Sequence, residues 1–328
     1  MFDTAATKGS GFVLVLLVAT ATITQVSAAE FPVRPVRMIV PGSPATGMDN
    51  LGRVVALGLA DIYKQQVIVD NRAGAGSLIG SGIVAGAAPD GYTIGIASTS
   101  TIVAPLLQIN PPFNPVKDFV NIALLASLTS VLVVAPEVPA KNLDEFIQYA
   151  KARPGQLNFA SIGAGSGAHL TPEIFNRVTG IQAVHVPFKT IADIVTEIRS
   201  SRVHYLLIIS PASLPMLQDG RLRALAVTST KRYVGLPDVP TVGEAGLRGA
   251  EVETMIGTIG PAALPKLLVN RLHADILSVL RLPDTKVRYE RFGTEPATET
   301  SRDTYAAKWK AEYELFRKLL PEIGLKPQ

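Results

Sequence analysis

The side chains best suited to chemistry in this sequence lie between Ser161 and Phe175, in the stretch SIGAGSGAHLTPEIF. Three glycines, two serines and one histidine precede an amphipathic run, which is typical of a backbone that approaches a ligand closely. Three kinds of chemistry use such a loop: dinucleotide binding, nucleophilic attack by a serine, and anion binding without a reaction.

Dinucleotide binding is supported by the segment Gly163–Ala168, which fits the pattern G-x-G-x-x-A between an expected strand and an expected helix. The next expected strand, however, ends in VHVPFK and offers no Asp or Glu that could bind a ribose. The loop also follows several strand–helix units instead of opening the fold. Both features argue against a dehydrogenase.

Nucleophilic attack by Ser166 would require the pattern G-x-S-x-G, but alanine stands at position 164. His169 lies on the same helical turn as Ser166, so it cannot be the base that comes later in the chain in that fold. These features argue against a hydrolase. We therefore predict no catalytic residue and expect that the protein is not an enzyme.

Anion binding without a reaction requires only hydrogen-bond donors and no catalytic residue. A Gly/Ser loop that enters a helix offers backbone N–H groups and the positive end of the helix dipole, which hold a carboxylate or a phosphate. Ser161 and Ser166 add hydroxyl donors. The alternative is that these serines only cap the helix and that His169 is a packed surface residue.

Three similar loops occur earlier in the chain, and each follows an expected strand. They are PGSPATGMD at 41–49, NRAGAGSLIG at 71–80 and ASTST at 97–101. In open α/β sheets, ligands bind at the carboxyl ends of the strands. The sequence therefore predicts a binding site that these loops form together, with no acid–base pair for catalysis.

The elements that must position these loops alternate between strands and helices, which indicates parallel βαβ units in two sets. We expect strands at 36–40, 65–71, 91–98, 130–136, 157–162, 182–188, 203–210 and 222–229. We expect helices after Asp49, at 142–155, up to Gly180, at 190–201, and at 265–283 and 300–320. Asp49 is expected to be the N-cap of the first helix.

Composition excludes several classes of protein. The chain has 328 residues, 47% of them hydrophobic and 18% charged, with a net charge of +4 and no basic block, which argues against nucleic-acid binding. It has no cysteine, so disulfides, thiol catalysis and zinc–thiolate sites are excluded. Its four histidines show no metal-binding spacing. We expect neither a metal nor a cofactor.

The N-terminus has the pattern of a signal peptide. Lys8 precedes the apolar run GFVLVLLVAT at 11–20, and the small residues VSAA follow at 26–29. We therefore expect residues 1–29 to be a cleaved signal peptide and the mature protein to be periplasmic, starting near Glu30. The alternative is a leader that is retained as a membrane anchor.

Seven motifs in this order resemble those of a known family. They are PVRMIVP, VDNRAGAGSLIG, APDGYTI, SIGAGSGAHL, VHVPFK, LRALAVTSTKR and LPDVPTVGEAGL. Together they resemble the substrate-binding proteins of tripartite tricarboxylate transporters, the Bug receptors, from about Pro32 to the C-terminus.

The resemblance implies an α/β type-II periplasmic binding-protein fold, with two lobes, a ligand cleft between them and two chain crossings. We place the crossings near 124–130 and 222–226, so lobe I comprises 30–126 and 225–328 and lobe II comprises 127–224. The implied ligand is a small organic carboxylate, and the implied partners are the membrane subunits of the transporter. A sensor kinase is the alternative partner. We expect a monomer.

The resemblance also implies ligand-binding positions in the loops named above. In lobe I these are Ser43, Ala45, Thr46, Gly47, Asp49, Gly74, Ala75, Gly76, Ser98 and Thr99. In lobe II they are Ser161, Gly165, Ser166, His169, Phe188 and Lys189. For Lys189 the alternative is a solvated charge at the rim.

Some positions depart from the family pattern. The usual Gly-Gly of the first loop is Ala45-Thr46 here, which reduces the freedom of the backbone and adds a hydroxyl. An Asp common in a later strand falls at Ile208. Without that acid the cleft suits an ammonium group less well, which favours a simple or aromatic carboxylate over an amino acid.

Overall fold

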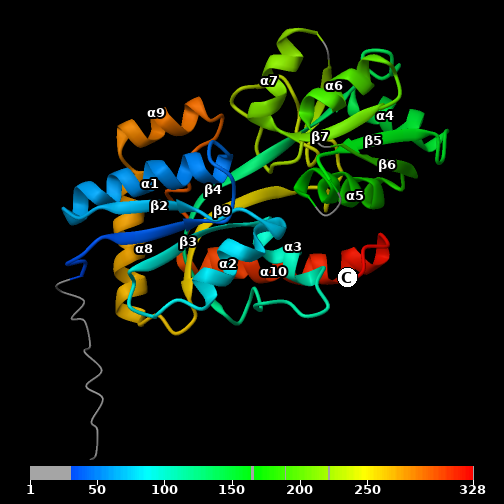
Figure 1. Cartoon of the computed structure of the whole chain (residues 1–328). Coiled ribbons are helices and arrows are strands. Elements are labelled where there is room, and N and C mark those ends of the chain that lie inside the picture. Colours follow the sequence, from blue (N-terminus) through cyan, green and yellow to red (C-terminus); the bar gives the residue numbers. More distant parts are fainter. Residues whose placement is uncertain (1–30, 164–165, 189, 221, 328) are drawn as a thin grey trace, which may run out of the picture.

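The strands of this protein form one continuous twisted sheet that runs through two lobes (Figure 1). The computed structural model describes residues 31–163, 166–188, 190–220 and 222–327. The strand order is β2-β1-β3-β9-β4-β7-β5-β6, and β8 also pairs with β4. The bounds are β1 Val36–Val40, β2 Val67–Asn71, β3 Thr93–Ser98, β4 Phe119–Val134, β5 Leu157–Ser161, β6 Ala183–Pro187, β7 Tyr205–Ile209, β8 Arg223–Val227 and β9 Glu253–Pro261.

Helices cover both faces of the sheet (Figure 1). The helices of the first lobe are α1 Gly47–Tyr63, the 3₁₀ turn η1 Ala75–Ser77, α2 Leu78–Ala85, α3 Thr99–Leu106, α8 Lys266–Leu280, α9 Pro283–Arg291 and α10 Arg302–Glu322. Those of the second lobe are α4 Leu143–Lys151, α5 Gly167–Thr179, α6 Ile191–Arg199 and α7 Ser210–Gln218.

Parallel pairing explains why the loops of each lobe meet at one edge. In the first lobe β1 pairs in parallel with both β2 and β3, and in the second lobe β5 pairs in parallel with both β6 and β7. A parallel strand is buried on both faces and is therefore apolar along its length. Strand β1, VRMIV, fits this rule, since only Arg37 is not fully buried.

Strand β4 connects the two lobes. Residues 119–129 pair antiparallel with β9 in the first lobe, and residues 130–134 pair with β7 and β8 in the second. The β4–β9 register shifts between Asn121 and Ala123 and again between Leu124 and Ala126, and such bulges increase the local twist. Only the second half of β4 was predicted, as the strand at 130–136, and residues 119–129 were not expected to be a strand.

Three hydrophobic clusters stabilise the molecule. One fills the second lobe and includes Phe146, Phe159 and Tyr205. The other two lie on opposite faces of the first lobe's sheet: one involves α1 and α8, and the other involves α2, α3 and α10 around Trp309. Leu170 and Ile174 of α5 belong to this last cluster, so the second lobe packs against the first.

Most expected elements are confirmed, including the strands at 36–40 and 157–162 and the helix that ends at Gly180. Strand β9 and helices α3, α7 and α9 were not expected, and the helix expected after the second loop is α2. Strand β9, ETMIGTIGP, contains two glycines and no alternation of apolar and polar residues, so its sequence resembles a loop.

No helix among the described residues is long and apolar enough to cross a bilayer. The expected signal peptide, residues 1–29, lies outside the described residues.

Candidate functional site

The first helix, α1, begins at a different N-cap from the expected one. Thr46 is the N-cap, and its side-chain oxygen accepts a hydrogen bond from the backbone N–H of Asp49. Asp49 lies in the first turn instead, where Oδ2 accepts from the backbone N–H of Ala45 at 2.8 Å. The prediction of Asp49 as N-cap was wrong: Thr46 caps the helix, and the Asp49 side chain accepts instead from the residue before the cap, Ala45.

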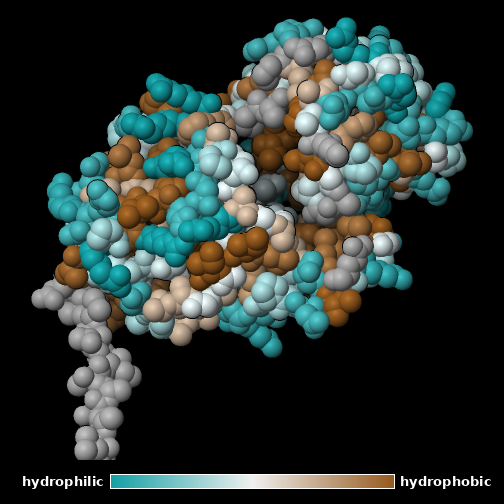
Figure 2. Space-filling view, in the orientation of Figure 1, coloured by the Kyte–Doolittle hydropathy of each residue, from teal (hydrophilic) through white to brown (hydrophobic). Residues whose placement is uncertain are grey.

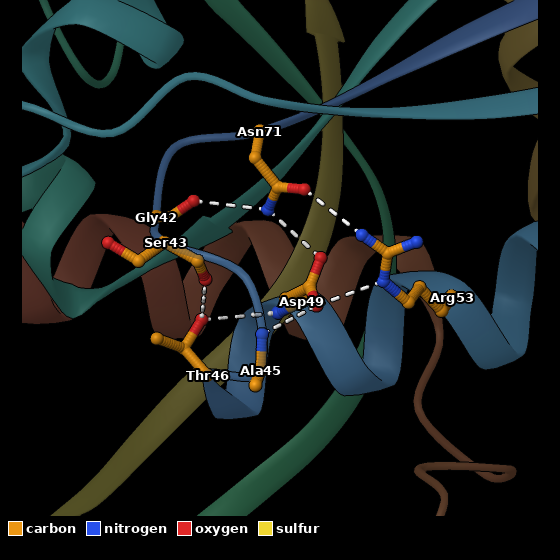
Figure 3. A network of polar contacts seen from close by, with 7 residues as sticks. All are labelled: Gly42, Ser43, Ala45, Thr46, Asp49, Arg53 and Asn71. Carbon is orange, nitrogen blue, oxygen red and sulfur yellow. Dashed lines mark hydrogen bonds and ion pairs between the residues drawn. The ribbon is translucent and has the colours of Figure 1, made fainter.

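The Asp49 carboxylate organises the first loop (Figure 3). It is 2% exposed, and besides Ala45 it accepts from Arg53 Nε at 2.9 Å and from Asn71 Nδ2 at 2.9 Å. Burial raises its pKa, but the hydrogen bonds from Arg53, Asn71 and Ala45 outweigh burial and hold the pKa below its usual value. The carboxylate is therefore ionised at neutral pH.

Asn71 joins the first and second loops (Figure 3). Its Nδ2 donates to Asp49 and, at 3.1 Å, to the backbone oxygen of Gly42, while its Oδ1 accepts from Arg53. Because Asn71 is also the register partner of Val40, the two loops leave adjacent strands at the same level. Asn71 belongs to the motif VDNRAGAGSLIG, but no role was predicted for it.

Several residues of these loops have a left-handed backbone. Ala45 has a φ of 63°, a conformation that costs a residue with a β-carbon about 1 kcal/mol or more. In the second loop, Gly74, Ala75, Gly76 and Ser77 all have positive φ. Turns of this kind are one way in which backbone anion sites are built. The Ala45 N–H of the first loop already donates to Asp49, so the second loop is the better candidate for backbone anion binding.

Serine hydroxyls join the second and third loops. Ser77 Oγ donates to the backbone oxygen of Pro41 at 3.0 Å and lies 2.7 Å from Ser100 Oγ, which lies 2.8 Å from Ser98 Oγ. Ser98 is also the N-cap of α3. All three loops of the first lobe are therefore tied together by side chains.

Thr99 is the first residue of α3, and its hydroxyl is also engaged. Its Oγ1 donates to Glu312 Oε1 of helix α10 at 2.5 Å. Ser98 and Thr99 are 6% and 7% exposed, whereas Ser43, Ala45 and Gly47 of the first loop and Gly74, Ala75 and Gly76 of the second are exposed. The predicted residues of this lobe thus comprise an exposed rim and a buried base.

In the second lobe, the predicted Ser161 and His169 lie beside a histidine that was not predicted. Ser161 Oγ is 2.7 Å from His185 Nε2, and the rings of His185 and His169 stack with centroids 3.8 Å apart. His185 also stacks on Phe159 at 5.0 Å. His169 is 4% exposed, so it is a buried residue and not the surface residue of the alternative interpretation.

The Gly/Ser loop of this lobe is held by Ser161 and Ser166. Ser161 Oγ donates to the backbone oxygen of Gly163 and accepts from its N–H, both at 3.1 Å. Ser166 is the N-cap of α5, and its hydroxyl donates to the same oxygen at 2.7 Å. The backbone N–H of Phe188 donates to the oxygen of Ser161 at 2.8 Å. Gly165 and Lys189 lie outside the described residues.

The stacked histidines make the second lobe sensitive to acid. Burial, aided by repulsion from His169, lowers the pKa of His185 from 6.5 to about 4. The unfolded chain therefore takes up a proton before the folded protein does, and stability falls as pH falls from 6.5 towards 4.

We expect the free energy of unfolding to fall by about 1 to 2 kcal/mol more in the wild type than in His185→Phe between about pH 7 and pH 4.5. This change in unfolding free energy is smaller than the whole pKa shift of His185 would give, because His185 is partly solvated. Urea unfolding followed by circular dichroism measures it, with His273→Gln as control. Equal pH dependence of the wild type and His185→Phe would contradict the assignment.

The loops of both lobes meet beside strand β9. A β-carbon built on Gly47, at the start of α1, would lie 3.9 Å from Ile256 and from Leu128. Ser98, before α3, is the register partner of Ile256, and a β-carbon on Gly167, at the start of α5, would lie 3.7 Å from Thr254 Oγ1. Three helix N-termini thus converge on residues 254–256. A hollow is visible where β4 and β9 pass between the lobes (Figure 2).

A separate cavity of about 510 Å³ contains none of the predicted residues. It lies between 229–235, 290–300 and the start of α7, and Glu253 and Lys308 line it. Burial raises the pKa of Glu253, and Lys308 and Ser127 partly offset this. The charged side chains that line the cavity have both signs, so the cavity is less suited to an anion than the three helix N-termini. No cluster of three or more metal-binding side chains occurs among the described residues.

The chain is similar to known proteins in sequence and in fold. Residues 51–323 match the model of the tripartite tricarboxylate transporter family receptor. The protein BugT of Bordetella pertussis is 35% identical over 289 residues, which cover 87% of this chain and 88% of BugT.

Solved structures show the same fold. The periplasmic binding protein BugD is 29% identical, with a TM-score of 0.73 over 91% of this chain and all of BugD. Rpa4515 of R. palustris, solved with adipate, is 30% identical, with a TM-score of 0.75 over 91% of this chain and all of Rpa4515. MatC of Rhodopseudomonas palustris, solved with bound malate, is 27% identical, with a TM-score of 0.72 over 88% of this chain and all of MatC.

These matches confirm the type-II periplasmic binding-protein fold that the sequence motifs imply. Because the family model matches residues 51–323 and BugT is 35% identical over 289 residues, the chain belongs to the family of tripartite tricarboxylate transporter receptors.

Proposed function

We propose that this protein is a periplasmic receptor that captures a small organic carboxylate between its lobes and delivers it to the membrane subunits of a tripartite tricarboxylate transporter. The observation that carries the proposal is the convergence of the N-termini of α1, α3 and α5 on residues 254–256 of β9. Each helix N-terminus carries a partial positive charge and free N–H groups, so together they favour an anion.

The ligand class is further supported by relatives. Rpa4515 was solved with adipate and MatC with malate, both of which are dicarboxylates. Ile208, where an Asp is common in the family, lies in β7 and is buried, so it offers no charge to an ammonium group. This favours a carboxylate without an amino group.

Capture requires two lobes that move relative to each other. The motifs placed the second crossing near 222–226, with lobe I as 30–126 and 225–328 and lobe II as 127–224. Because β8 pairs with β4 in the second lobe, and Val242 and Ala250 pack in the core of that lobe, we propose instead that the second crossing lies just before β9, near Glu253. Leu170 and Ile174 of α5 already pack against the first lobe, so we propose that a hinge motion opens this contact and that a ligand favours the closed form by binding it more tightly.

Thermal unfolding tests the proposal. We expect adipate or malate to raise the melting temperature, since a ligand that binds only the folded protein stabilises it in proportion to the logarithm of its excess over Kd. Ser98→Ala and Ser161→Ala, one in each lobe, should weaken binding about tenfold by disturbing the loops. Ser278→Ala, an exposed position on α8, is the matched control.

Two outcomes would overturn parts of the proposal. If a panel of organic acids leaves the melting temperature unchanged, the receptor function is wrong. If the acids bind but the Ser98 and Ser161 variants behave like Ser278→Ala, the site lies elsewhere, for example in the cavity that Glu253 and Lys308 line. N-terminal sequencing of the protein from the periplasmic fraction tests export and cleavage.

A further inference from the structure

Helix α10 places a buried acid directly behind the start of helix α3. Glu312 Oε1 accepts the hydrogen bond from Thr99 Oγ1 at 2.5 Å, although residues 99 and 312 are far apart in sequence. The other oxygen, Oε2, is buried and has no hydrogen-bond partner among the described residues. The residue as a whole is half-buried. The carboxyl group therefore lies inside the protein, one hydroxyl away from the proposed site.

The surroundings of Glu312 do not neutralise its charge. Helix α3 and strand β4, which pack against α10, carry no charged side chain. On α10 itself Tyr305 is buried nearby and Lys308 lies one turn earlier, where its charge acts on Glu253 of β9. The Asn121 amide and the Tyr305 hydroxyl, which are both uncharged, are also buried. The neighbours of Glu312 are thus mainly neutral.

Burial in this neutral environment raises the pKa of Glu312 from 4.5 to about 7, and the hydrogen bond from Thr99 limits the rise. Both protonation states are therefore accessible near neutral pH.

The protonation state of Glu312 decides which way the Thr99 hydroxyl points. An ionised carboxylate only accepts hydrogen bonds, so the Thr99 hydroxyl points its hydrogen at Glu312. A protonated carboxyl group can instead donate to Thr99 Oγ1, and the Thr99 proton is then free to point toward an anion at the start of α3.

We propose that Glu312 is a positioning residue of the carboxylate site, and that the ligand binds together with one proton at Glu312. The proposal rests on the proposed function and adds a regulation to the same site. The ligand and an ionised Glu312 would be two like charges on either side of Thr99, whereas a protonated Glu312 removes the repulsion and supplies a donor.

The sign of the pH dependence follows. A bound carboxylate favours protonated Glu312, so affinity is highest below the pKa that Glu312 has in the free protein. Affinity then falls as pH rises above about 7, by at most tenfold per pH unit when one proton is linked to binding. It stops falling at the higher pKa that Glu312 has in the complex.

Calorimetric titration with adipate and with malate from about pH 6.5 to about pH 9 measures this dependence. Both acids are ionised over this range, so their own titration contributes little. Repeating the titration in buffers with different ionisation enthalpies counts the protons taken up on binding, and we expect up to one proton near pH 7.5 to 8.

Three variants test whether Glu312 positions the Thr99 hydroxyl for binding or only supports the fold. Glu312→Gln supplies an amide donor to Thr99 at every pH, so we expect tight binding without pH dependence. Thr99→Val removes the hydroxyl, so we expect about tenfold weaker binding at low pH and a smaller proton uptake. Glu314→Gln, an exposed position on the same helix, should keep the wild-type pH dependence. Fluorescence of Trp309, the only tryptophan, checks that each variant is folded.

The outcomes distinguish this proposal from the one it rests on. Binding of either acid without pH dependence in the wild type, or a pH dependence that survives in Glu312→Gln, overturns the role of Glu312 and leaves the receptor function intact. If neither acid nor any other organic acid binds at any pH, the proposed function is wrong and the role of Glu312 falls with it. A pH dependence that Glu312→Gln abolishes and Glu314→Gln retains supports the proposal.

Discussion

Asp49→Ala is expected to lower the free energy of unfolding by about 3 kcal/mol. The Asp49 carboxylate is 2% exposed and accepts from Ala45, Arg53 and Asn71, so alanine would leave three donors without their partner. A hydrogen bond to a charged group contributes about 1.5 to 3 kcal/mol, and the loss of all three is reduced because the Arg53 side chain and Ala45 are exposed to water. Urea unfolding at neutral pH, followed by circular dichroism, measures the change.

Two variants control this prediction. Asp61→Ala removes an exposed acid from the same helix and should change stability by less than about 0.5 kcal/mol. Asp49→Asn keeps the shape but replaces an oxygen acceptor with an N–H₂ donor, so it should be intermediate. Because the pKa of Asp49 is held below its usual value, the wild type should lose this advantage as pH falls through that pKa. An Asp49→Ala protein as stable as Asp61→Ala would show that the network is not needed for folding.

Glu312→Gln is expected to raise the free energy of unfolding at about pH 8 by up to about 3 kcal/mol and to leave it nearly unchanged at about pH 4.5. The pKa of Glu312 is about 7 in the folded protein and about 4.5 in the unfolded chain. The folded protein therefore binds more protons over this interval, and wild-type stability falls as pH rises from 4.5 through 7. Glutamine carries no charge at any pH and escapes this loss.

Urea unfolding at both pH values, followed by Trp309 fluorescence, checks the prediction, with Glu314→Gln as the matched control. Trp309 lies on α10 one turn before Tyr313 and is 2% exposed, so it reports on the same helix. If Glu312→Gln gains nothing at pH 8 relative to pH 4.5, the carboxyl group of Glu312 is hydrated in solution.

The loops of the site could be predicted from sequence because local signals define them. Each consists of small residues between an apolar strand and an amphipathic helix, and Ser98 and Ser166 are both the N-caps of their helices. The pattern does not decide between Thr46 and Asp49 as N-cap, since both residue types cap helices. In the structure, Thr46 accepts from the N–H of Asp49, and Asp49 accepts from the N–H of Ala45. Whether these loops bind a ligand is still a prediction.

Residues that act across the fold gave no such signal. Glu312 lies in an ordinary helical sequence, and only the packing of α10 on α3 brings it to Thr99. His185 alternates with apolar residues in a short strand, and nothing in that pattern indicates a ring stacked on His169. Strand β9 is recognisable only by its neighbours β3 and β4, because two glycines interrupt its pattern. Contacts between segments far apart in sequence determine the surroundings of Glu312, of His185 and of strand β9.

The position of β9 between β3 and β4 has a consequence for biosynthesis. Strands β4 to β8 follow one another along the chain, so the second lobe can complete its sheet as soon as residue 227 has been made. Strand β3, although made early, has an unpaired edge until residues 253–261 arrive, and such edges favour aggregation. The first lobe, although translated first, thus lacks one strand of its sheet while the second lobe is made, and the edge of β3 needs protection over that interval.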